Sequence, residues 1–208
     1  MAIIATSNGS AQRELIEPGN YVARCYKMIQ IGTVKETING VDKMLHKVRI
    51  GWELPTELRV FKEETGEQPL IIDKEYTLSM SEKSNLRQML KSWRGKDFTE
   101  EEAKAFDITV LLGKPCLINI IHKPSKTDPS RHYEEISGIT TIVKGMSVPP
   151  AINPTEVLSF DSFNHELLES LPDFIKDKVK SSEEYKEMMS NAKEIPDANR
   201  GDDDDLPF

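Results

Sequence analysis

Hydrophobic and polar residues alternate in several stretches of the first 150 residues, a pattern typical of β-strands with one buried face. The clearest alternation lies between residues 43 and 54, after a first stretch at residues 21–31 that is rich in aromatic and β-branched residues. Asn39-Gly40 lies between them and is a strong signal for a β-hairpin. We therefore predict two antiparallel strands, the second of them closed by Pro55. The expected buried face carries Met44, His46, Val48, Ile50, Trp52 and Leu54.

The pattern changes to helical spacing after a third strand, which we expect at residues 76–80. Apolar residues then recur at intervals of three and four positions, at Leu86, Met89, Leu90 and Trp93. Ser84 suits the N-cap of this helix and Gly95 suits its end. Thr99 and Glu102 form a capping box for a second short helix. Two more strands are expected at residues 116–122 and 133–143.

The order of elements is therefore three strands, a helical insert and two strands. This order predicts a mainly β protein with a five-stranded OB-fold barrel, whose helical insert lies between strands 3 and 4. A five-stranded sheet with the helix packed on one face would have the same order. We expect a flexible arm at residues 1–18 and the OB-fold domain at residues 19–148. An acidic helical extension or linker would follow at residues 149–200, and an acidic tip at residues 201–208.

Charge separates the last quarter of the chain from the rest. Residues 1–150 carry 21 basic and 20 acidic side chains, whereas residues 151–208 carry 6 and 15. The first part is therefore free to present a local basic face although the whole chain has a net charge of −8. Three short helices of modest apolar content are expected near residues 162–170, 172–179 and 182–191. The sequence leaves open whether they pack on the barrel or stay partly unfolded.

The composition also restricts the function classes. Two cysteines are too few for a disulfide framework, and the first residues lack the basic and apolar segments of a signal peptide. No apolar run approaches the ~20 residues that span a bilayer, so we expect a cytoplasmic protein without membrane contact. Neither Gly95-Lys96 nor Gly113-Lys114 has the upstream glycine of a phosphate-binding loop. The histidines lack metal-ligand spacing, and we expect no enzymatic activity, metal or cofactor.

Basic residues with nearby aromatics favour binding of a single-stranded nucleic acid. Lys43, Lys47 and Arg49 share the polar face of the strand at residues 43–54, where OB-folds bind oligonucleotides. A solvated strand face is the alternative explanation. Tyr26 and Phe61 each lie between two cations and could stack on bases. The candidate nucleic-acid-binding residues are Arg24, Tyr26, Lys27, Lys43, Lys47, Arg49, Phe61, Lys83 and Arg87.

Residues 202–208 combine an acidic run with two large apolar side chains, a combination typical of a peptide that docks in a pocket of another protein. The residues are Asp202, Asp203, Asp204, Asp205, Leu206, Pro207 and Phe208. This segment resembles the acidic tip of bacterial single-stranded DNA-binding proteins, which ends Asp-Asp-Asp-Ile-Pro-Phe. The resemblance implies recruitment of a replication or recombination enzyme, such as a polymerase, helicase, nuclease or recombination mediator.

The charged linker departs from that bacterial family. The chain is more similar to the single-stranded DNA-binding proteins of tailed bacteriophages, which combine an OB domain with an acidic C-terminus. The resemblance implies binding and protection of single-stranded DNA, without strong sequence preference, during replication, recombination and repair in a bacterial cell. The oligomeric state stays open. Two alternatives are a strand-annealing protein or recombination mediator, and an interaction module that binds no DNA and occupies host pockets with its tip.

Overall fold

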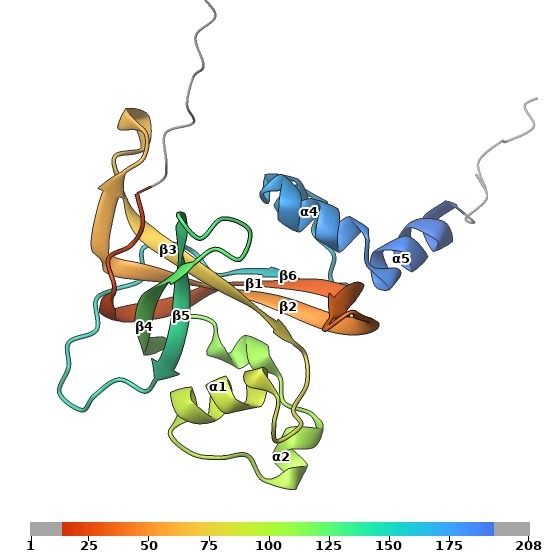
Figure 1. Ribbon diagram of the computed structural model, residues 1–208, viewed down its shortest axis with the longest axis horizontal. Coiled ribbons are helices and arrows are strands. Elements are labelled where there is room, and N and C mark those ends of the chain that lie inside the picture. Colours follow the sequence, from red (N-terminus) through yellow and green to blue (C-terminus); the bar gives the residue numbers. More distant parts are fainter. Residues whose placement is uncertain (1–13, 194–208) are drawn as a thin grey trace, which may run out of the picture.

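The structure is a computed structural model that describes residues 14–193. Five antiparallel strands form an open sheet in the order β3-β2-β1-β4-β5, and a short sixth strand runs parallel to β1 (Figure 1). The strands are β1 (Gly19–Ile38), β2 (Val41–Val60), β3 (Glu67–Thr77), β4 (Pro115–Pro124), β5 (His132–Thr140) and β6 (Glu156–Leu158). The helices are α1 (Asn85–Arg94), α2 (Glu100–Lys104), α3 (His165–Ser170), α4 (Asp173–Lys180) and α5 (Glu183–Lys193).

The hairpin of β1 and β2 forms where the sequence predicts it. Asn39 and Gly40 have φ angles of 52° and 78°, the positive values that a tight two-residue hairpin turn requires. Both strands are 20 residues long, and the register shifts twice along β1. Each shift is an irregularity that bends the hairpin and increases its twist. The hairpin therefore curves around the core instead of lying flat.

Several strand boundaries differ from the sequence predictions. β1 extends to Ile38 instead of residue 31, and β5 ends at Thr140 instead of residue 143. Pro55 does not end β2, which continues to Val60, because the pairing with β3 is interrupted between Leu54 and Leu58. A proline has no backbone N–H to donate, and at this interruption of the pairing no inter-strand hydrogen bond from Pro55 is required. The third strand is Glu67–Thr77 and not residues 76–80. Its acidic and basic side chains interrupt the apolar pattern, so the sequence reveals only its last residues.

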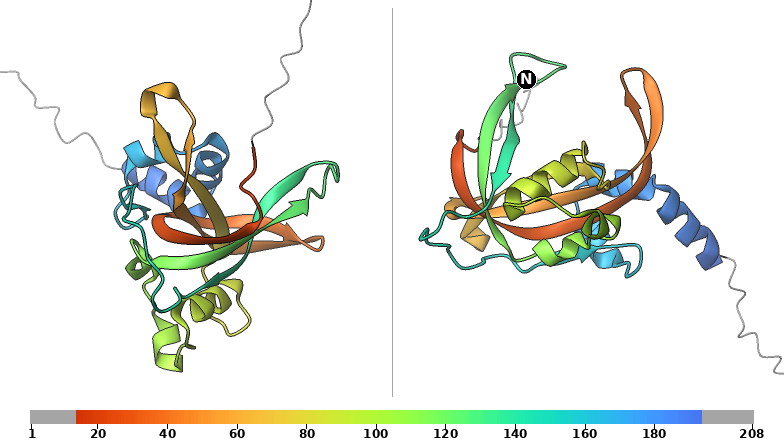
Figure 2. Two further views of the ribbon diagram at one scale, coloured as in Figure 1. Left: turned by 90° about the vertical axis from the view of Figure 1, so that its left-hand side faces the viewer. Right: turned by 90° about the horizontal axis from the view of Figure 1, so that it is seen from below.

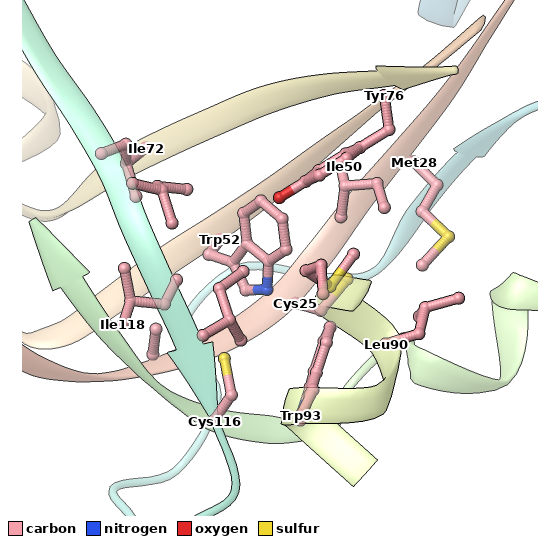
Figure 3. Packing of buried hydrophobic residues seen from close by; sticks show 14 of the residues in the cluster. Cys25, Met28, Ile50, Trp52, Ile72, Tyr76, Leu90, Trp93, Cys116 and Ile118 are labelled. Carbon is pink, nitrogen blue, oxygen red and sulfur yellow. The ribbon is translucent and has the colours of Figure 1, made fainter. Parts of the chain in front are cut away.

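The main core lies between the inner face of the sheet and α1, with Trp52 at its centre (Figure 3). Trp52 is 0% exposed, and its ring centroid lies 6.1 Å from that of Trp93 on α1. The Trp93 indole donates a hydrogen bond to the Pro115 carbonyl at 3.0 Å. The α1 helix begins as predicted, because Ser84 accepts a hydrogen bond from the backbone of Arg87. The expectation that both tryptophans are core residues is confirmed.

A second apolar cluster joins the helical extension to the opposite face of β1. The helices α3 to α5 lie on the other side of the sheet from α1 and α2 (Figure 1). The cluster contains Ile29, Ile31, Val34, Leu158, Leu168, Leu171, Ile175 and Val179. The extension therefore packs on the sheet from residue 156 to α5, which answers the question that the sequence leaves open. No helix within residues 14–193 is long and apolar enough to cross a lipid bilayer.

Residues 14–18, predicted as part of the flexible arm, pack against β4 and β5. Ile16 is 2% exposed, and its backbone donates to a Glu134 carboxylate oxygen at 2.6 Å. The His122 ring Nε2 lies 2.7 Å from the Ile16 carbonyl oxygen. The folded domain therefore begins before Gly19. The rest of the predicted arm, residues 1–13, lies outside the described residues.

The Glu53 side chain connects the segment after β5 to the outer face of β2 through hydrogen bonds. Its side chain is 0% exposed and accepts hydrogen bonds from the backbones of Ile152 and Asn153, at 3.0 and 2.7 Å. The Asn153 side-chain amide donates a third, at 2.9 Å. Because Glu53→Ala removes three hydrogen bonds to a buried carboxylate and leaves partly buried donors without this partner, we expect it to lower the free energy of unfolding by about 2 to 3 kcal/mol. Urea denaturation of this variant and of Glu82→Ala, an exposed control, would measure the difference. Equal midpoints would contradict the role of Glu53.

Candidate nucleic-acid interface

A cavity of about 1060 Å³ opens where β3 and β5 face each other without pairing. Its walls come from the β1–β2 hairpin, β3, the first turns of α1, and β5. The β1–β2 and β4–β5 hairpins rise at opposite ends of the domain (Figure 2, right). Within residues 14–193 no backbone hydrogen bond joins β3 to β5, but Lys74 Nζ donates to the Ile136 carbonyl at 2.7 Å. The cavity thus lies at an open seam of the sheet.

Four lysines line this cavity: Lys43, Lys47, Lys74 and Lys83. Lys43 on the hairpin and Lys83 before α1 are exposed, and neither forms an ion pair within the described part of the chain. An exposed and unpaired ammonium group is available to a phosphate at little desolvation cost. The structure therefore brings two exposed lysines among the predicted nucleic-acid-binding residues, from the β1–β2 hairpin and from the segment before α1, to the lining of one cavity.

The carboxylates that line the cavity are paired with lysines. Glu36 and Glu75 both bind Lys178 of α4, at 2.8 and 2.7 Å. Glu135 binds Lys123 at 2.9 Å. Burial alone would raise the pKa of Glu36, but the hydrogen bonds from its lysine partners lower it. Lys47, which lines the cavity, also binds Glu36 and Glu75. The cavity lysines that form no ion pair within residues 14–193 are therefore Lys43, Lys74 and Lys83.

Lys74 is a cavity residue that the sequence analysis missed. It lies between Ile72 and Tyr76 on the core-facing side of β3, and it is half-buried at the seam. Burial lowers its pKa, and the nearby Lys123 charge acts in the same direction. A lysine in the core register of a strand is the signal that could have identified it. That signal requires the correct bounds of β3, which the sequence did not provide.

The outer face of β2 is not the open basic face that the alternation predicted. Lys47 is 12% exposed and binds Glu36 and Glu75, at 2.6 and 2.9 Å. Arg49 forms an ion pair with Asp73, and its guanidinium carbon lies 5.1 Å from the centre of the Phe174 ring. Each cation pairs with a carboxylate from β1 or β3, which the alternation within β2 does not reveal. This part of the face is therefore close to neutral.

Three further candidates line a second cavity, of about 480 Å³, beside the β2–β3 hairpin. Tyr26 is 7% exposed, and Phe61 is 54% exposed. Lys27 forms an ion pair with Glu156 at 2.6 Å, and its ammonium lies 5.4 Å from the centre of the Tyr26 ring. Burial raises the pKa of the Tyr26 hydroxyl, which stays protonated. The cavity therefore combines an exposed aromatic ring with a partly compensated cation.

Arg24 and Arg87 line neither cavity, and their guanidinium groups donate hydrogen bonds to backbone carbonyls of nearby loops. The Arg24 guanidinium donates to the carbonyl oxygens of Gly113 and Pro149, at 2.7 and 2.6 Å. The Arg87 guanidinium donates to those of Met80 and Phe98, at 3.1 and 3.0 Å. These contacts satisfy backbone carbonyls and occupy guanidinium donors that the prediction assigned to phosphates. Sequence position alone does not distinguish such an arginine from one that binds phosphate.

The placement of the cysteines and of the possible metal ligands is clear in the described residues. Residues 14–193 contain no group of three or more His, Cys, Asp or Glu side chains that could hold a metal ion. Cys25 and Cys116 are both buried and free, and burial raises the pKa of the Cys25 thiol to about 12. A protonated, buried thiol is a poor nucleophile. The predicted tip, residues 202–208, lies outside the described residues.

Comparison with known proteins identifies no relative, because no family model and no curated protein matches the chain.

Proposed function

We propose that this protein binds single-stranded DNA without strong sequence preference, in the cavity between β3 and β5. The observation that carries the proposal is the set of lysines there, two of which are exposed and unpaired within residues 14–193. Phosphates attract such groups whatever the base sequence. The chain would protect single strands during replication, recombination and repair, in the cytoplasm of a bacterial cell, as the tailed-bacteriophage resemblance implies.

The topology supports a finer proposal, that the sheet is an OB-type barrel open at one seam. The order β3-β2-β1-β4-β5, with α1 between β3 and β4, agrees with that fold. OB-folds bind oligonucleotides on strands 2 and 3 and on the loops that join strands 1–2 and 4–5. The cavity has β3, the β1–β2 hairpin and β5 in its walls. The lysines therefore lie where an OB-fold would bind a single strand.

Titration of a labelled dT oligonucleotide with the full chain, followed by fluorescence anisotropy, tests the proposal. Three phosphate contacts in the cavity predict that the logarithm of affinity falls with the logarithm of salt concentration, with a slope of about −2. A duplex of the same length serves as the control and should bind more weakly. Absence of binding at low salt, both with and without residues 202–208, would reject the proposed function.

We further propose that residues 202–208 recruit partner enzymes and compete with DNA for the cavity. The motivation is the contrast between the acidic last quarter of the chain and the cavity lysines. Deletion of residues 202–208 is expected to raise the affinity for dT several-fold at low salt, because a competing anion is removed. Replacing only Leu206, Pro207 and Phe208 with serine keeps the four aspartates and is the matched control. If the deletion leaves the affinity unchanged, competition does not occur.

The compensated face of β2 favours a second candidate, an interaction module that binds no DNA. Lys47 and Arg49 each have carboxylate partners in the fold, as the cations of an ordinary protein surface often do. Such a module would act through residues 202–208 alone. The titration separates the two candidates, because only the first predicts salt-sensitive binding that depends on the cavity lysines.

A further inference from the structure

The two cavities lie at the two ends of one row of side chains on the outer face of β3. Glu75 lines the first cavity and Ile71 lines the second. Alternate residues of a strand share a face, so Asp73 lies between them on the same side. The four-residue separation corresponds to ~13 Å of strand. An extended ligand could therefore reach from one cavity to the other along β3.

Phe174 of α4 lies over the middle of this row. It is 61% exposed, and its ring faces the guanidinium of Arg49, which Asp73 holds in place. Neighbouring Ile175 is buried in the second apolar cluster, so α4 is anchored without Phe174. One turn later, Lys178 binds Glu36 and Glu75 and fixes the orientation of the helix. The helix that carries the ring is thus fixed on the sheet, and the ring itself lies at the surface beside an arginine.

Isolated exposed apolar side chains are common on proteins and need no function. Phe174 differs in its surroundings, because it lies between a lysine-lined cavity and a cavity with a second exposed ring, Phe61. Single-stranded nucleic acids bind to such combinations of cations and flat aromatic surfaces. Because α4 is already anchored on the sheet, stacking a base on Phe174 needs no ordering of the helix.

The second cavity suits an unstacked base. Its rim includes the exposed Phe61 and Ile71, and the buried Tyr26 lies among its lining residues. Lys27 provides a cation beside these apolar groups. The volume of about 480 Å³ is within the range of small-molecule sites. A base could stack on Phe61 while its phosphate lies near Lys27.

We propose that single-stranded DNA continues from the first cavity along β3, stacks one base on Phe174 beside Arg49, and places another against Phe61 in the second cavity. This inference rests on the proposed function and adds to it two stacking sites. It also makes the C-terminal extension, through α4, a part of the DNA-binding surface. The occupant is an extended single strand, because a base inside a duplex is paired and cannot stack on a protein ring.

Affinity measured against oligonucleotide length tests this path. A dT dinucleotide spans about 7 Å and stays within the first cavity, whereas an oligonucleotide of about 16 nucleotides reaches both cavities. Phe174→Ala and Phe61→Ala are each expected to weaken binding of the long oligonucleotide roughly tenfold and to leave the short one unchanged. Phe174→Trp should restore the affinity, because it keeps a flat ring. Val143→Ala, at a position that is 58% exposed and lines neither cavity, is the control.

The outcomes separate this inference from the proposed function. If the unmodified chain binds neither oligonucleotide, the proposed function fails. If it binds both and the phenylalanine variants bind the long one equally well, only the path is wrong. An equal loss for both lengths also overturns the path, because Phe174 would then act on the first cavity. Circular dichroism and a thermal melt of each variant exclude loss of the fold as the cause.

Discussion

Replacing Lys43, Lys74 and Lys83 together with alanine is expected to weaken binding of a dT oligonucleotide about a hundredfold at low salt. Lys43 and Lys83 are exposed residues that line the cavity, and Lys74 lies at its seam. Each lost contact with a phosphate costs about 1 kcal/mol after solvent screening, so three contacts amount to roughly two orders of magnitude. The dependence on salt concentration should become flatter at the same time, since fewer counterions are released.

The matched control replaces Lys96, Lys144 and Lys186, which are exposed and line neither cavity. This triple variant changes the net charge by the same amount and should retain nearly all of the affinity. Anisotropy titrations at two salt concentrations provide both comparisons. Equal losses in the two triple variants would mean that only the net charge of the domain matters, and the cavity would then not be the binding site.

Trp52→Ala is expected to destabilise the domain by about 3 to 5 kcal/mol, the largest effect on folding that we predict. Trp52 is 0% exposed and packs against Trp93 between the sheet and α1 (Figure 3). Its removal leaves a cavity that the surrounding strands cannot fill without giving up their pairing. Such a loss is a large part of the stability of an ordinary domain.

Urea denaturation followed by circular dichroism measures this effect, with Val41→Ala as the exposed control. Trp52→Phe keeps a large ring and should recover much of the stability. A change below about 1 kcal/mol in Trp52→Ala would contradict the central place of this side chain in the core. If Trp52→Ala does not fold, the phenylalanine variant still gives a measurable difference.

Turn and capping residues predicted correctly the turn and the helix starts that they form. Asn39-Gly40 set the β1–β2 turn, because few residue pairs accept two positive φ angles. Ser84 marked the start of α1, and Thr99 with Glu102 formed the expected capping box of α2. β3 was placed too late, since its charged residues hide the alternation. Pro55 did not end β2, because an interruption in pairing with β3 accommodates it.

The candidate site could be predicted only in part. Lys43 was chosen because it shares a predicted strand face with Lys47 and Arg49, and Lys83 because it lies at the predicted start of a helix. The fold brings both to one cavity. Lys74 was missed, because its importance depends on a seam between strands that are distant in sequence. Arg24 was chosen for its charge, yet its guanidinium holds two loop carbonyls. A sequence pattern describes neighbours along the chain and does not include these partners.

By itself the sequence determined the buried face of β2 from Val48 to Leu54, the start of α1, the burial of Trp52 and Trp93 and the acidity of the last quarter of the chain. The prediction was wrong for Met44, which is 51% exposed near the tip of the hairpin. Periodicity and capping are local properties, so each follows from residues a few positions apart. Only the tertiary structure decided which cations stay uncompensated. Lys47 forms an ion pair with Glu75, and Arg49 forms one with Asp73. Lys178 of α4 also pairs with Glu75, which lines the cavity. Electrostatic interactions depend on distance in space, and folding brings those charges together from positions that can lie more than a hundred residues apart.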